Sequence, residues 1–391
     1  MTRRTICVVG RVLDQDDGLG VYSLNLLRGL FELDYTSRYV VLLQTPRHQS
    51  SFALFDNVET RVLPARFKTW WDQVLVARVA RQIDADLIFN PKFSLPLISR
   101  RPGVFVLHGS DWYVNPQHYE WWDNLYVRFL LPLYCRKAKR LLAISQRVLD
   151  DLVGFVRLDP AKVTVSYAAP SRHFRPPSQS TELVKFRSQY RLPERYIFSV
   201  GRTLHTGHGS FPYYPGGNVE GLVRAYEEYR ARGGDLALVI AGRNVRGYLK
   251  AQGVVESKLR DIHFTGYIPH EEIHLAYGLA QFFVLTTLYE SFSLPLVEAM
   301  ACGCPVIAPN TGACPEVAAG AARLVDPQDP SAIAEAMTEI SGSAALRDEL
   351  RRLGLERARA FSWRAVAECT LGVFDEVCPL QGRDLGNIRP G

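Results

Sequence analysis

Short runs of apolar residues alternate with amphipathic helical patterns along most of this chain. In the N-terminal half, "TICVVG" is typical of a buried strand, "GLGVYSLNLLRGLFEL" has helical apolar spacing, and "RYVVLLQT" is again typical of a strand. Strands that are apolar on both faces and separated by helices predict parallel sheets covered by helices on both sides. We therefore predict an α/β fold made of doubly wound parallel sheets.

The alternation stops once, at "AAPSRHFRPPSQS", residues 168–180, where three prolines interrupt the periodicity, and it resumes with "RYIFSVG". Because 391 residues exceed one ordinary domain, we predict two Rossmann-like domains that face each other across a cleft. The N-terminal domain is predicted to span residues 1–172 and the C-terminal domain residues 173–368. A C-terminal segment, 369–391, is free to cross back to the N-terminal domain, and the last helical pattern, "SWRAVAECTLGVFDEV", is compatible with packing on either domain.

The charge and cysteine content argues against some classes of protein. A net charge of +6 is far below the surplus typical of a nucleic-acid binder, so no nucleic-acid partner is expected. The seven cysteines lie mostly in apolar patterns, which indicates buried reduced thiols, and Cys302, Cys304 and Cys314 lack the further ligands of a metal site. Since no apolar run reaches about 18 residues and no secretory signal begins the chain, the sequence predicts a cytoplasmic protein.

Two glutamates lie eight positions apart in "TTLYESFSLPLVEAMACGCPVIAP", residues 286–309. Glu290 follows a predicted strand, at the carboxyl end where ligands bind in such sheets. Glu298 lies about one turn inside the next helix, which is otherwise so apolar that the carboxylate needs a partner, such as the hydroxyls of a ribose. A hydrolase-type carboxylate pair fits poorly, because its members normally come from different elements. The remaining alternative is that Glu290 caps the helix and Glu298 is solvated.

The helix between the two glutamates begins with a sequence suited to binding an anion. Pro295 is favourable in the first turn, where its missing N–H costs nothing. The free backbone N–H groups around Ser293 and Leu294 then favour a negatively charged ligand, phosphate above all.

Three other predicted strand ends carry polar or glycine residues: the "GLG" of Gly18–Gly20, His108 in "HGSD" and Arg202 in "VGRT". A G-x-G pair by itself is more often a turn than a phosphate loop, and a lone histidine is more often an ordinary strand-end residue. Their position at strand ends is what makes them candidate site residues.

The segment "YESFSLPLVEAMACGCPVIAPNTGACPEVAAGAARLVDPQDPSAIAEAM" resembles the signature of the retaining glycosyltransferases of family GT4, also called glycosyltransferase group 1, which have the GT-B fold. The shared pattern is Glu-x7-Glu, a helix of small residues, a G-x-P-V-[IV]-A strand and an acidic residue before "LVDP". The resemblance covers the C-terminal half almost throughout. The N-terminal half is matched more loosely, through "GLGVYSLNLLRGL", "VLHGSDWYVNPQHY" and "LLAISQ".

The resemblance implies a retaining transfer of a hexose-type sugar from a nucleotide-diphosphate donor to a hydroxyl acceptor, in glycan or glycolipid biosynthesis, without a metal or other cofactor. The C-terminal domain would bind the donor, and the N-terminal domain a glycan, glycolipid or small-molecule acceptor. It implies that His108, Glu290 and Arg202 are catalytic. The implied donor contacts are Glu298 to the ribose, Glu290 to the sugar hydroxyls, Ser293, Leu294 and Arg202 to the diphosphate, Tyr267 to the base, and Gly18 and Gly20 in a loop near the phosphates.

The sequence departs from the family pattern at one phosphate-binding position. In the family, a lysine precedes the asparagine that starts the helix after "VGR", and here Gly217 stands in its place. Arg243, His205 and His208 are candidates to replace that cation. This departure keeps two alternatives open: a non-catalytic or altered sugar-nucleotide-binding protein, and an epimerase or phosphorylase on the same fold. An NAD-dependent dehydrogenase is disfavoured, because "GLGVYS" is not G-x-G-x-x-G and no acidic residue ends "RYVVLLQT".

Aromatic and basic residues interleave in "FKTWW" and in "WYVNPQHYEWWDNLYVRFLLPLYCRKAKR" of the N-terminal half. Such a composition suits a peripheral contact with a membrane surface. It suits equally a packed helix with an acceptor pocket, because tryptophan and tyrosine also serve packing and sugar stacking. The sequence leaves both interpretations open.

Overall fold

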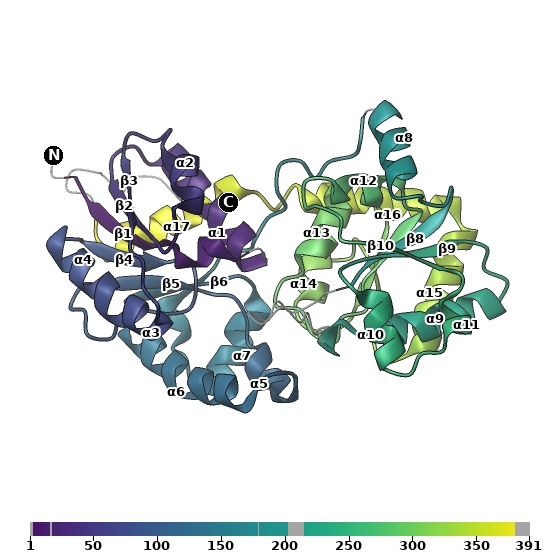
Figure 1. The fold of residues 1–391 in the computed structure, drawn as a ribbon, viewed down its shortest axis with the longest axis horizontal. Helices are drawn as coiled ribbons and strands as arrows, with labels where there is room; N and C mark the ends of the chain where they lie inside the picture. The colour runs from purple at the N-terminus through teal and green to yellow at the C-terminus, as the bar shows by residue number, and fades with distance from the viewer. Residues whose placement is uncertain (1–2, 16–17, 179, 202–214, 380–391) are drawn as a thin grey trace. The chain divides into compact units, whose positions relative to one another are not determined.

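A computed structural model describes residues 3–15, 18–178, 180–201 and 215–379 of the chain (Figure 1). The chain divides into two compact units, which we call unit 1 (Met1–Ala169 with Ser362–Gly391) and unit 2 (Pro170–Phe361). The sequence predicts the corresponding divisions after residues 172 and 368. The second predicted division would cut helix α17 (Trp363–Val377), which belongs as a whole to unit 1.

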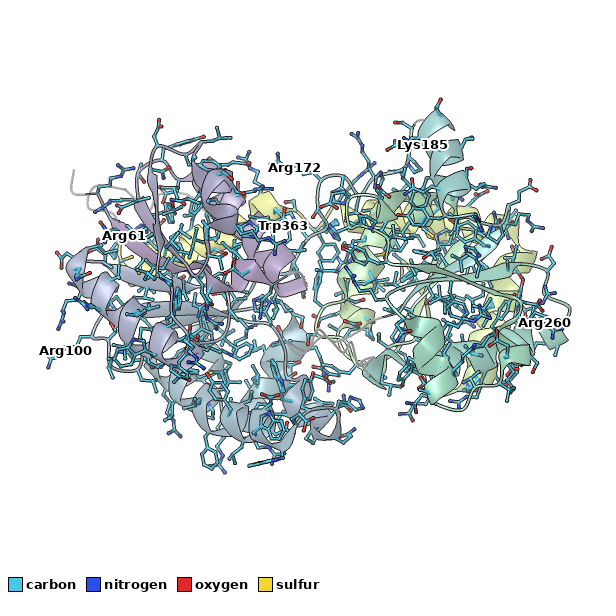
Figure 2. The ribbon with its side chains drawn as sticks, in the orientation of Figure 1. Arg61, Arg100, Arg172, Lys185, Arg260 and Trp363 are labelled. Atoms are coloured by element: carbon cyan, nitrogen blue, oxygen red, sulfur yellow. The ribbon has the colours of Figure 1, made fainter. Side chains whose placement is uncertain are left out.

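The packing of α17 against α1 (Gly18–Leu33) explains why the chain returns to unit 1. A Cβ atom on Gly29 of α1 would lie 3.1 Å from both the Cβ of Ala367 and the carbonyl oxygen of Trp363, so the glycine permits a close approach of the two helices. The Trp363 ring, labelled in Figure 2, lies edge-on to Tyr22 with 5.3 Å between ring centroids. These contacts join residues more than 300 positions apart and leave no local signal in the sequence.

Unit 1 is built on a seven-stranded parallel sheet with the order β3-β2-β1-β4-β5-β6-β7. Its inner strands are buried along almost their whole length, because helices cover both faces. Helices α1, α2 and α17 lie on one face, and α3, α4, α6 and α7 lie on the other (Figure 1). The strands are β1 (Thr5–Val9), β2 (Arg38–Leu43), β3 (Val58–Val62), β4 (Leu87–Asn90), β5 (Gly103–Leu107), β6 (Arg140–Ala143) and β7 (Val163–Val165). The remaining α-helices are α2 (Gln49–Phe52), α3 (Lys68–Trp70), α4 (Val76–Gln82), α5 (Asp111–Val114), α6 (Trp121–Lys137) and α7 (Gln146–Val156).

Unit 2 is built on a six-stranded parallel sheet with the order β10-β9-β8-β11-β12-β13. Helices α9, α10, α11 and α15 lie on one face, and α12, α13 and α16 lie on the other (Figure 1). The strands are β8 (Tyr196–Val200), β9 (Ala237–Ala241), β10 (Ile262–Gly266), β11 (Phe282–Val284), β12 (Val306–Pro309) and β13 (Arg323–Val325). The helices are α8 (Ser180–Gln189), α9 (Val219–Ala231), α10 (Val245–Ala251), α11 (Glu256–Leu259), α12 (Ile273–Leu279), α13 (Leu294–Ala301), α14 (Cys314–Ala318), α15 (Pro330–Gly342) and α16 (Ala344–Ala358).

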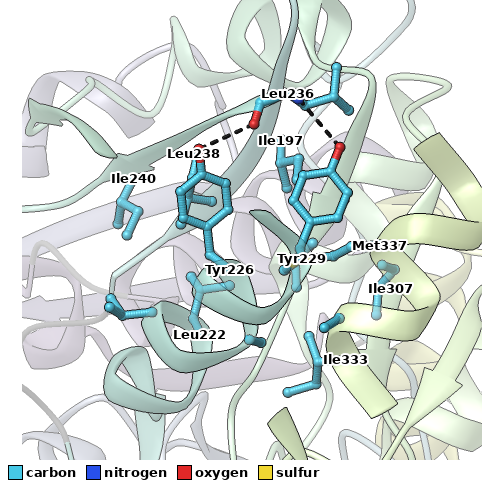
Figure 3. Close-up of a cluster of buried hydrophobic side chains, with 14 of the residues drawn as sticks. Ile197, Leu222, Tyr226, Tyr229, Leu236, Leu238, Ile240, Ile307, Ile333 and Met337 are labelled. Atoms are coloured by element: carbon cyan, nitrogen blue, oxygen red, sulfur yellow. Dashed lines mark hydrogen bonds between the residues drawn. The ribbon is translucent and has the colours of Figure 1, made fainter. Parts of the chain in front are cut away.

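The core of unit 2 lies between α9, α15 and the sheet (Figure 3). Two tyrosines of α9 are almost fully buried there, and each satisfies its hydroxyl through the backbone of Leu236. The Tyr226 hydroxyl donates to the Leu236 carbonyl at 3.2 Å, and the Leu236 N–H donates to the Tyr229 hydroxyl at 3.3 Å. These bonds attach α9 to the residue that precedes β9, so both buried hydroxyls have a partner.

Two doubly wound parallel sheets agree with the predicted α/β architecture. All seven cysteines are free thiols, five of them buried, as the sequence predicts. Within the ranges that the structure describes, no helix is both long and apolar enough to cross a membrane.

Candidate functional site

The site in unit 2 lies at the point where the strand order reverses, between β8 and β11. Ligands in doubly wound sheets bind at this switch point, outside the carboxyl ends of the strands. The loop from Leu285 to Ser293 leaves β11 there and leads into α13, which begins at Leu294 where the sequence predicts a helix start. Glu290 lies in the middle of this loop and is partly buried.

The loop after β12 holds the backbone of the Glu290 loop in place. The Ala313 N–H donates to the Glu290 carbonyl at 2.8 Å, and the Thr311 hydroxyl donates to the Leu288 carbonyl at 2.9 Å. Gly312 has a φ of +60° and lies directly against Glu290. A Cβ atom on Gly312 would lie 2.5 Å from the Glu290 carbonyl oxygen and 2.7 Å from its nitrogen, so only glycine fits at this position.

Replacing Gly312 with alanine should therefore destabilise the protein by about 2 kcal/mol or more, because both the positive φ and the contact with backbone atoms become unfavourable. Gly342→Ala is a matched control in the same unit, since a Cβ atom there would meet nothing within 4 Å. The free energy of unfolding of both variants, measured in urea, checks this expectation. Equal stability of the two variants would show that the loop accommodates a side chain.

The start of α13 combines a strained residue with free N–H groups. Ser293 precedes the helix with φ 75° and ψ 76°, a left-handed conformation that residues other than glycine rarely adopt. Its side chain is buried and approaches the Cys314 thiol. The first N–H groups of any helix have no intrahelical acceptor, so the turn at Ser293 presents those of Leu294 and Leu296 at the switch point, while Pro295 has none to present. Strain of this kind is common at ligand sites.

Glu298 lies in the second turn of α13 and is only 6% exposed, which contradicts the alternative of a solvated helix residue. Its partner is His270, from the loop between β10 and α12. The Nε2 atom of His270 lies 3.1 Å from the Glu298 Oε1 atom. Burial lowers the pKa of His270, but the hydrogen bond and the charge of Glu298, together with the charge of Glu271, outweigh burial and raise this pKa above 6.5.

His173 packs against His270 and is itself in contact with His274. The Nε2 atom of His173 donates to the His270 carbonyl at 2.9 Å, and the His173 ring lies 5.2 Å from that of His270 and 5.6 Å from that of His274. Burial, followed by the charges of His270 and His274, lowers the pKa of His173. Among the described residues, no group of histidine, cysteine or acidic side chains is arranged to hold a metal ion. The hydrogen bond from His173 supports the backbone of His270.

The raised pKa of His270 makes its contribution to stability depend on pH. A group whose pKa is raised by folding stabilises the protein fully below its unfolded pKa, near 6.5, and loses this contribution as the pH rises through the folded value. We expect His270→Gln to lower the free energy of unfolding by about 1 kcal/mol at low pH and by less as the pH rises above 6.5. Urea unfolding of both proteins from about pH 6 to pH 9 checks this; a difference independent of pH would contradict it.

Tyr267 and Arg243 lie together at the carboxyl ends of β10 and β9. The Arg243 guanidinium carbon lies 4.2 Å from the centroid of the Tyr267 ring, which is 54% exposed. Such a cation–π pair offers a flat, partly positive surface to a ligand.

Gly217 lies beside the end of β11, where its carbonyl accepts from the Thr286 hydroxyl at 3.3 Å. The position at which the family has a lysine is therefore next to the switch point. Arg202, His205 and His208 lie outside the described residues.

The candidate residues of unit 1 gather at the carboxyl edge of its own sheet. His108 follows β5, its Nε2 atom donates to the Pro91 carbonyl at 2.6 Å, and its ring lies edge-on to Tyr22 of α1 at 4.7 Å. Burial and the nearby Lys92 lower the pKa of His108 to about 4, so the imidazole is neutral at physiological pH.

The glycines at the start of α1 allow a close approach of the backbone. A Cβ atom on Gly20 would lie 1.9 Å from the carbonyl oxygen of Gln15, so a larger residue does not fit there. Gly18 is the first residue of the helix. Since Tyr22 of the same helix contacts His108, the start of α1 and the end of β5 lie on the same edge of unit 1.

The structure thus brings Glu290, Ser293, Leu294 and Glu298 together in unit 2, with Tyr267 on the same edge of the sheet at the end of the outermost strand, β10. In unit 1 it brings the start of α1 near His108. The sequence analysis missed His270. Its only signal was its place in "YIPHEEI", just beyond the carboxyl end of a predicted strand. Its pairing with Glu298 joins a loop to helix α13, 28 residues further along the chain, and could not be predicted from that pattern.

Both halves of the chain match known protein families. Residues 207–342 match the family described as Glycosyl transferases group 1, and residues 17–168 match Glycosyltransferase Family 4. The chain is 27% identical over 300 residues to O-antigen chain mannosyltransferase B of Escherichia coli, a match that covers 74% of each protein. It is 24% identical over 275 residues to the serotype-specific mannosyltransferase WbdA of Escherichia coli, which covers 69% of this chain but 32% of that longer protein.

Solved structures of similar fold extend over almost the whole chain. The structure of HepE from Anabaena in complex with UDP and glucose aligns with a TM-score of 0.71, covering 96% of this chain and 100% of that one. At 16% sequence identity this likeness concerns the fold, and it confirms the GT-B fold class.

Proposed function

Because the chain belongs to the group 1 glycosyltransferases of family GT4, we propose that it transfers a hexose-type sugar from a nucleotide-diphosphate donor to a hydroxyl of a glycan or glycolipid. We further propose that the anomeric configuration is retained. The observation that carries this proposal is the pairing of a strained helix start at Ser293 with a buried carboxylate, Glu298, at the switch point of unit 2.

The donor fits this arrangement group by group. The N–H groups at the start of α13 and Arg202 would meet the diphosphate, where the helix dipole favours negative charge. Glu298 would accept bonds from the two hydroxyls of a ribose, because a carboxylate has about four acceptor positions and His270 occupies one of them. Glu290 would position the hydroxyls of the transferred sugar. The flat pair of Tyr267 and Arg243 would stack on the base.

In unit 1, the proposed role of His108 follows from its neutral state. An imidazole that donates through Nε2 to the Pro91 carbonyl, with a pKa of about 4, has an unprotonated Nδ1 that can accept a hydrogen bond from a sugar hydroxyl. It would position the sugar and would not act as a general acid. Gly18 and Gly20 would let the backbone at the start of α1 approach the phosphates.

The reaction is proposed to need no metal ion, because the helix N-terminus and arginine side chains would stabilise the charge of the leaving diphosphate. We expect the rate of sugar transfer to be unchanged after dialysis against EDTA. Loss of activity on chelation, with recovery on adding Mg²⁺ or Mn²⁺, would contradict this part of the proposal.

A transfer experiment tests the proposed function. Two relatives are named mannosyltransferases, so GDP-mannose is the first donor to test, followed by UDP-, ADP- and dTDP-sugars. Incubation with a donor and oligosaccharide acceptors should yield a new glycosidic bond whose anomeric configuration, read from the coupling constants in NMR spectra, equals that of the donor. An inverted product would contradict retention, and release of a free, epimerised sugar would favour an epimerase.

One observation favours a second candidate, a protein that binds a sugar nucleotide without transferring the sugar. Gly217 replaces the family lysine directly beside the end of β11, so a phosphate-binding cation is missing at that position. Calorimetric binding of a donor, without product from any acceptor in the panel, would support this candidate over the transferase.

A further inference from the structure

Helix α6 of unit 1 has a row of large apolar side chains on its outer surface. Their exposed fractions range from 42% to 70%. We call this row the α6 stripe. It consists of Trp121, Trp122, Leu125, Phe129 and Leu133.

The stripe occupies one continuous face of the helix. At about 100° per residue, its five side chains fall within an arc of about 120°. The opposite face packs into unit 1 through four buried side chains: Val127, Leu131, Tyr134 and Cys135. Since this inner face already attaches α6 to the core, the outer row is not needed for folding. An exposed apolar row of this kind is typical of a surface that contacts a partner or a membrane.

Basic side chains lie within this arc or at its edge. Arg128 and Arg136 are both exposed, and by helix periodicity they project among the residues of the stripe. The acidic residues nearby, Glu120 and Asp123, lie at the start of the helix and fall on other sides of it. The stripe itself therefore presents apolar side chains with two arginines, whereas Asp123 lies on the side toward Lys68 of α3, on which its charge acts.

Helix α3 extends this surface along one side of α6. The Lys68 ammonium group lies 5.6 Å from the centroid of the Tyr126 ring, which brings the two helices into contact on the same face of the sheet (Figure 1). On either side of Lys68, the large rings of Phe67 and Trp70 are exposed. The Arg66 guanidinium lies 5.8 Å from the Phe67 ring. Residues 66–70 thus combine exposed aromatic rings with basic groups, as the α6 stripe does.

We propose that the α6 stripe, with Phe67 and Trp70, docks unit 1 on an anionic lipid bilayer. Tryptophan, phenylalanine and leucine insert at the boundary between headgroups and acyl chains, while arginines on the same face bind anionic headgroups. The helix lies flat in this interface, because its inner face remains packed on unit 1. The positive charge on the stripe matches an anionic surface and selects a bilayer over an uncharged apolar partner. The inference does not depend on the proposed donor chemistry.

Vesicle binding of the full chain tests this surface. We expect co-sedimentation with vesicles of phosphatidylglycerol and phosphatidylcholine in equal parts, and at least about tenfold weaker binding to pure phosphatidylcholine. The double variant Arg128→Glu/Arg136→Glu should bind the anionic vesicles at least about tenfold more weakly, since each basic group near the surface contributes to the attraction. The triple variant Trp121→Ser/Trp122→Ser/Phe129→Ser should show a similar loss and should lose the blue shift of tryptophan fluorescence.

A control variant with the same change of net charge distinguishes binding through the α6 stripe from a general effect of the protein's charge. Arg224 and Arg260 are exposed residues of unit 2, the latter labelled in Figure 2, and Arg224→Glu/Arg260→Glu should bind vesicles as the wild type does. Unchanged thermal unfolding of all variants shows that they are folded. Equal binding by the stripe variants and the control, or no binding by the wild type, would overturn the proposal. A wild-type dimer in sedimentation equilibrium that becomes monomeric in the stripe variants would also overturn it, because the stripe would then join two copies of the chain.

Discussion

Replacing Glu290 with alanine is expected to lower kcat about 100- to 1,000-fold while the protein remains folded, because a group that positions the transferred sugar acts mainly in the transition state. The structure indicates that the Glu290 side chain can be removed without unfolding the loop. The loop is held through the Glu290 backbone, whose carbonyl accepts from the Ala313 N–H, so removal of the side chain leaves this anchor in place. Steady-state kinetics with the donor identified in the transfer experiment measure the loss.

The matched control is Glu335→Ala, which removes an exposed glutamate from α15 of the same unit. It should retain the kcat of the wild type. Thermal unfolding of Glu290→Ala within a few degrees of the wild type shows that the effect is not a loss of fold. Turnover of Glu290→Ala at the wild-type rate would exclude Glu290 from the reaction and leave only the helix start and Glu298 in the proposed donor site.

The second large effect is expected for Glu298→Gln, which should weaken donor binding about 10- to 100-fold. The glutamine keeps the volume of the side chain and its contact with His270, but it removes the charge that strengthens bonds from two ribose hydroxyls. Bonds to a charged group contribute about 1.5 to 3 kcal/mol, which corresponds to this range of affinity. KM for the donor should rise accordingly, with a smaller effect on kcat.

Glu298→Ala should behave differently, because it removes the partner of His270 and also leaves a cavity. A loss of about 2 to 4 kcal/mol of stability is expected from such a buried change. Comparing Glu298→Gln with Glu298→Ala distinguishes loss of the ribose contact, measured as donor affinity, from loss of the contact with His270, measured as stability. Donor affinity of Glu298→Gln equal to that of the wild type would show that Glu298 only supports His270.

The sequence predicted the parts of this protein that depend on local patterns. The alternation of apolar strands with helices was enough to predict two doubly wound sheets, and Pro295 was enough to place the start of α13. Gly312 lies in the segment whose sequence resembles the family signature. The need for glycine there arises from the backbone of Glu290, 22 residues earlier in the chain. Contacts of that kind appear only when the strands are assembled.

The features that the sequence did not predict arise from long-range packing. The pairing of His270 with Glu298 depends on β10 and β11 ending at the same edge of the sheet. The close packing of α17 on α1 uses the space left by Gly29, which lies in an ordinary helical pattern. For α6 the sequence left membrane contact and core packing equally open. Its inner face is core, and its outer face is the exposed stripe, so both kinds of residue occur on the same helix.

Calorimetric titration with nucleotide-diphosphate sugars tests most directly whether the carboxyl edge of unit 2 is a donor site. One donor of the panel should bind the wild type, and Glu298→Gln should bind the same donor 10- to 100-fold more weakly, by about 1.5 to 3 kcal/mol. Glu335→Gln should bind it with the wild-type affinity. If no donor binds, or if wild type and Glu298→Gln bind with equal affinity, then Glu298 is not part of a nucleotide-sugar site and the central claim is wrong.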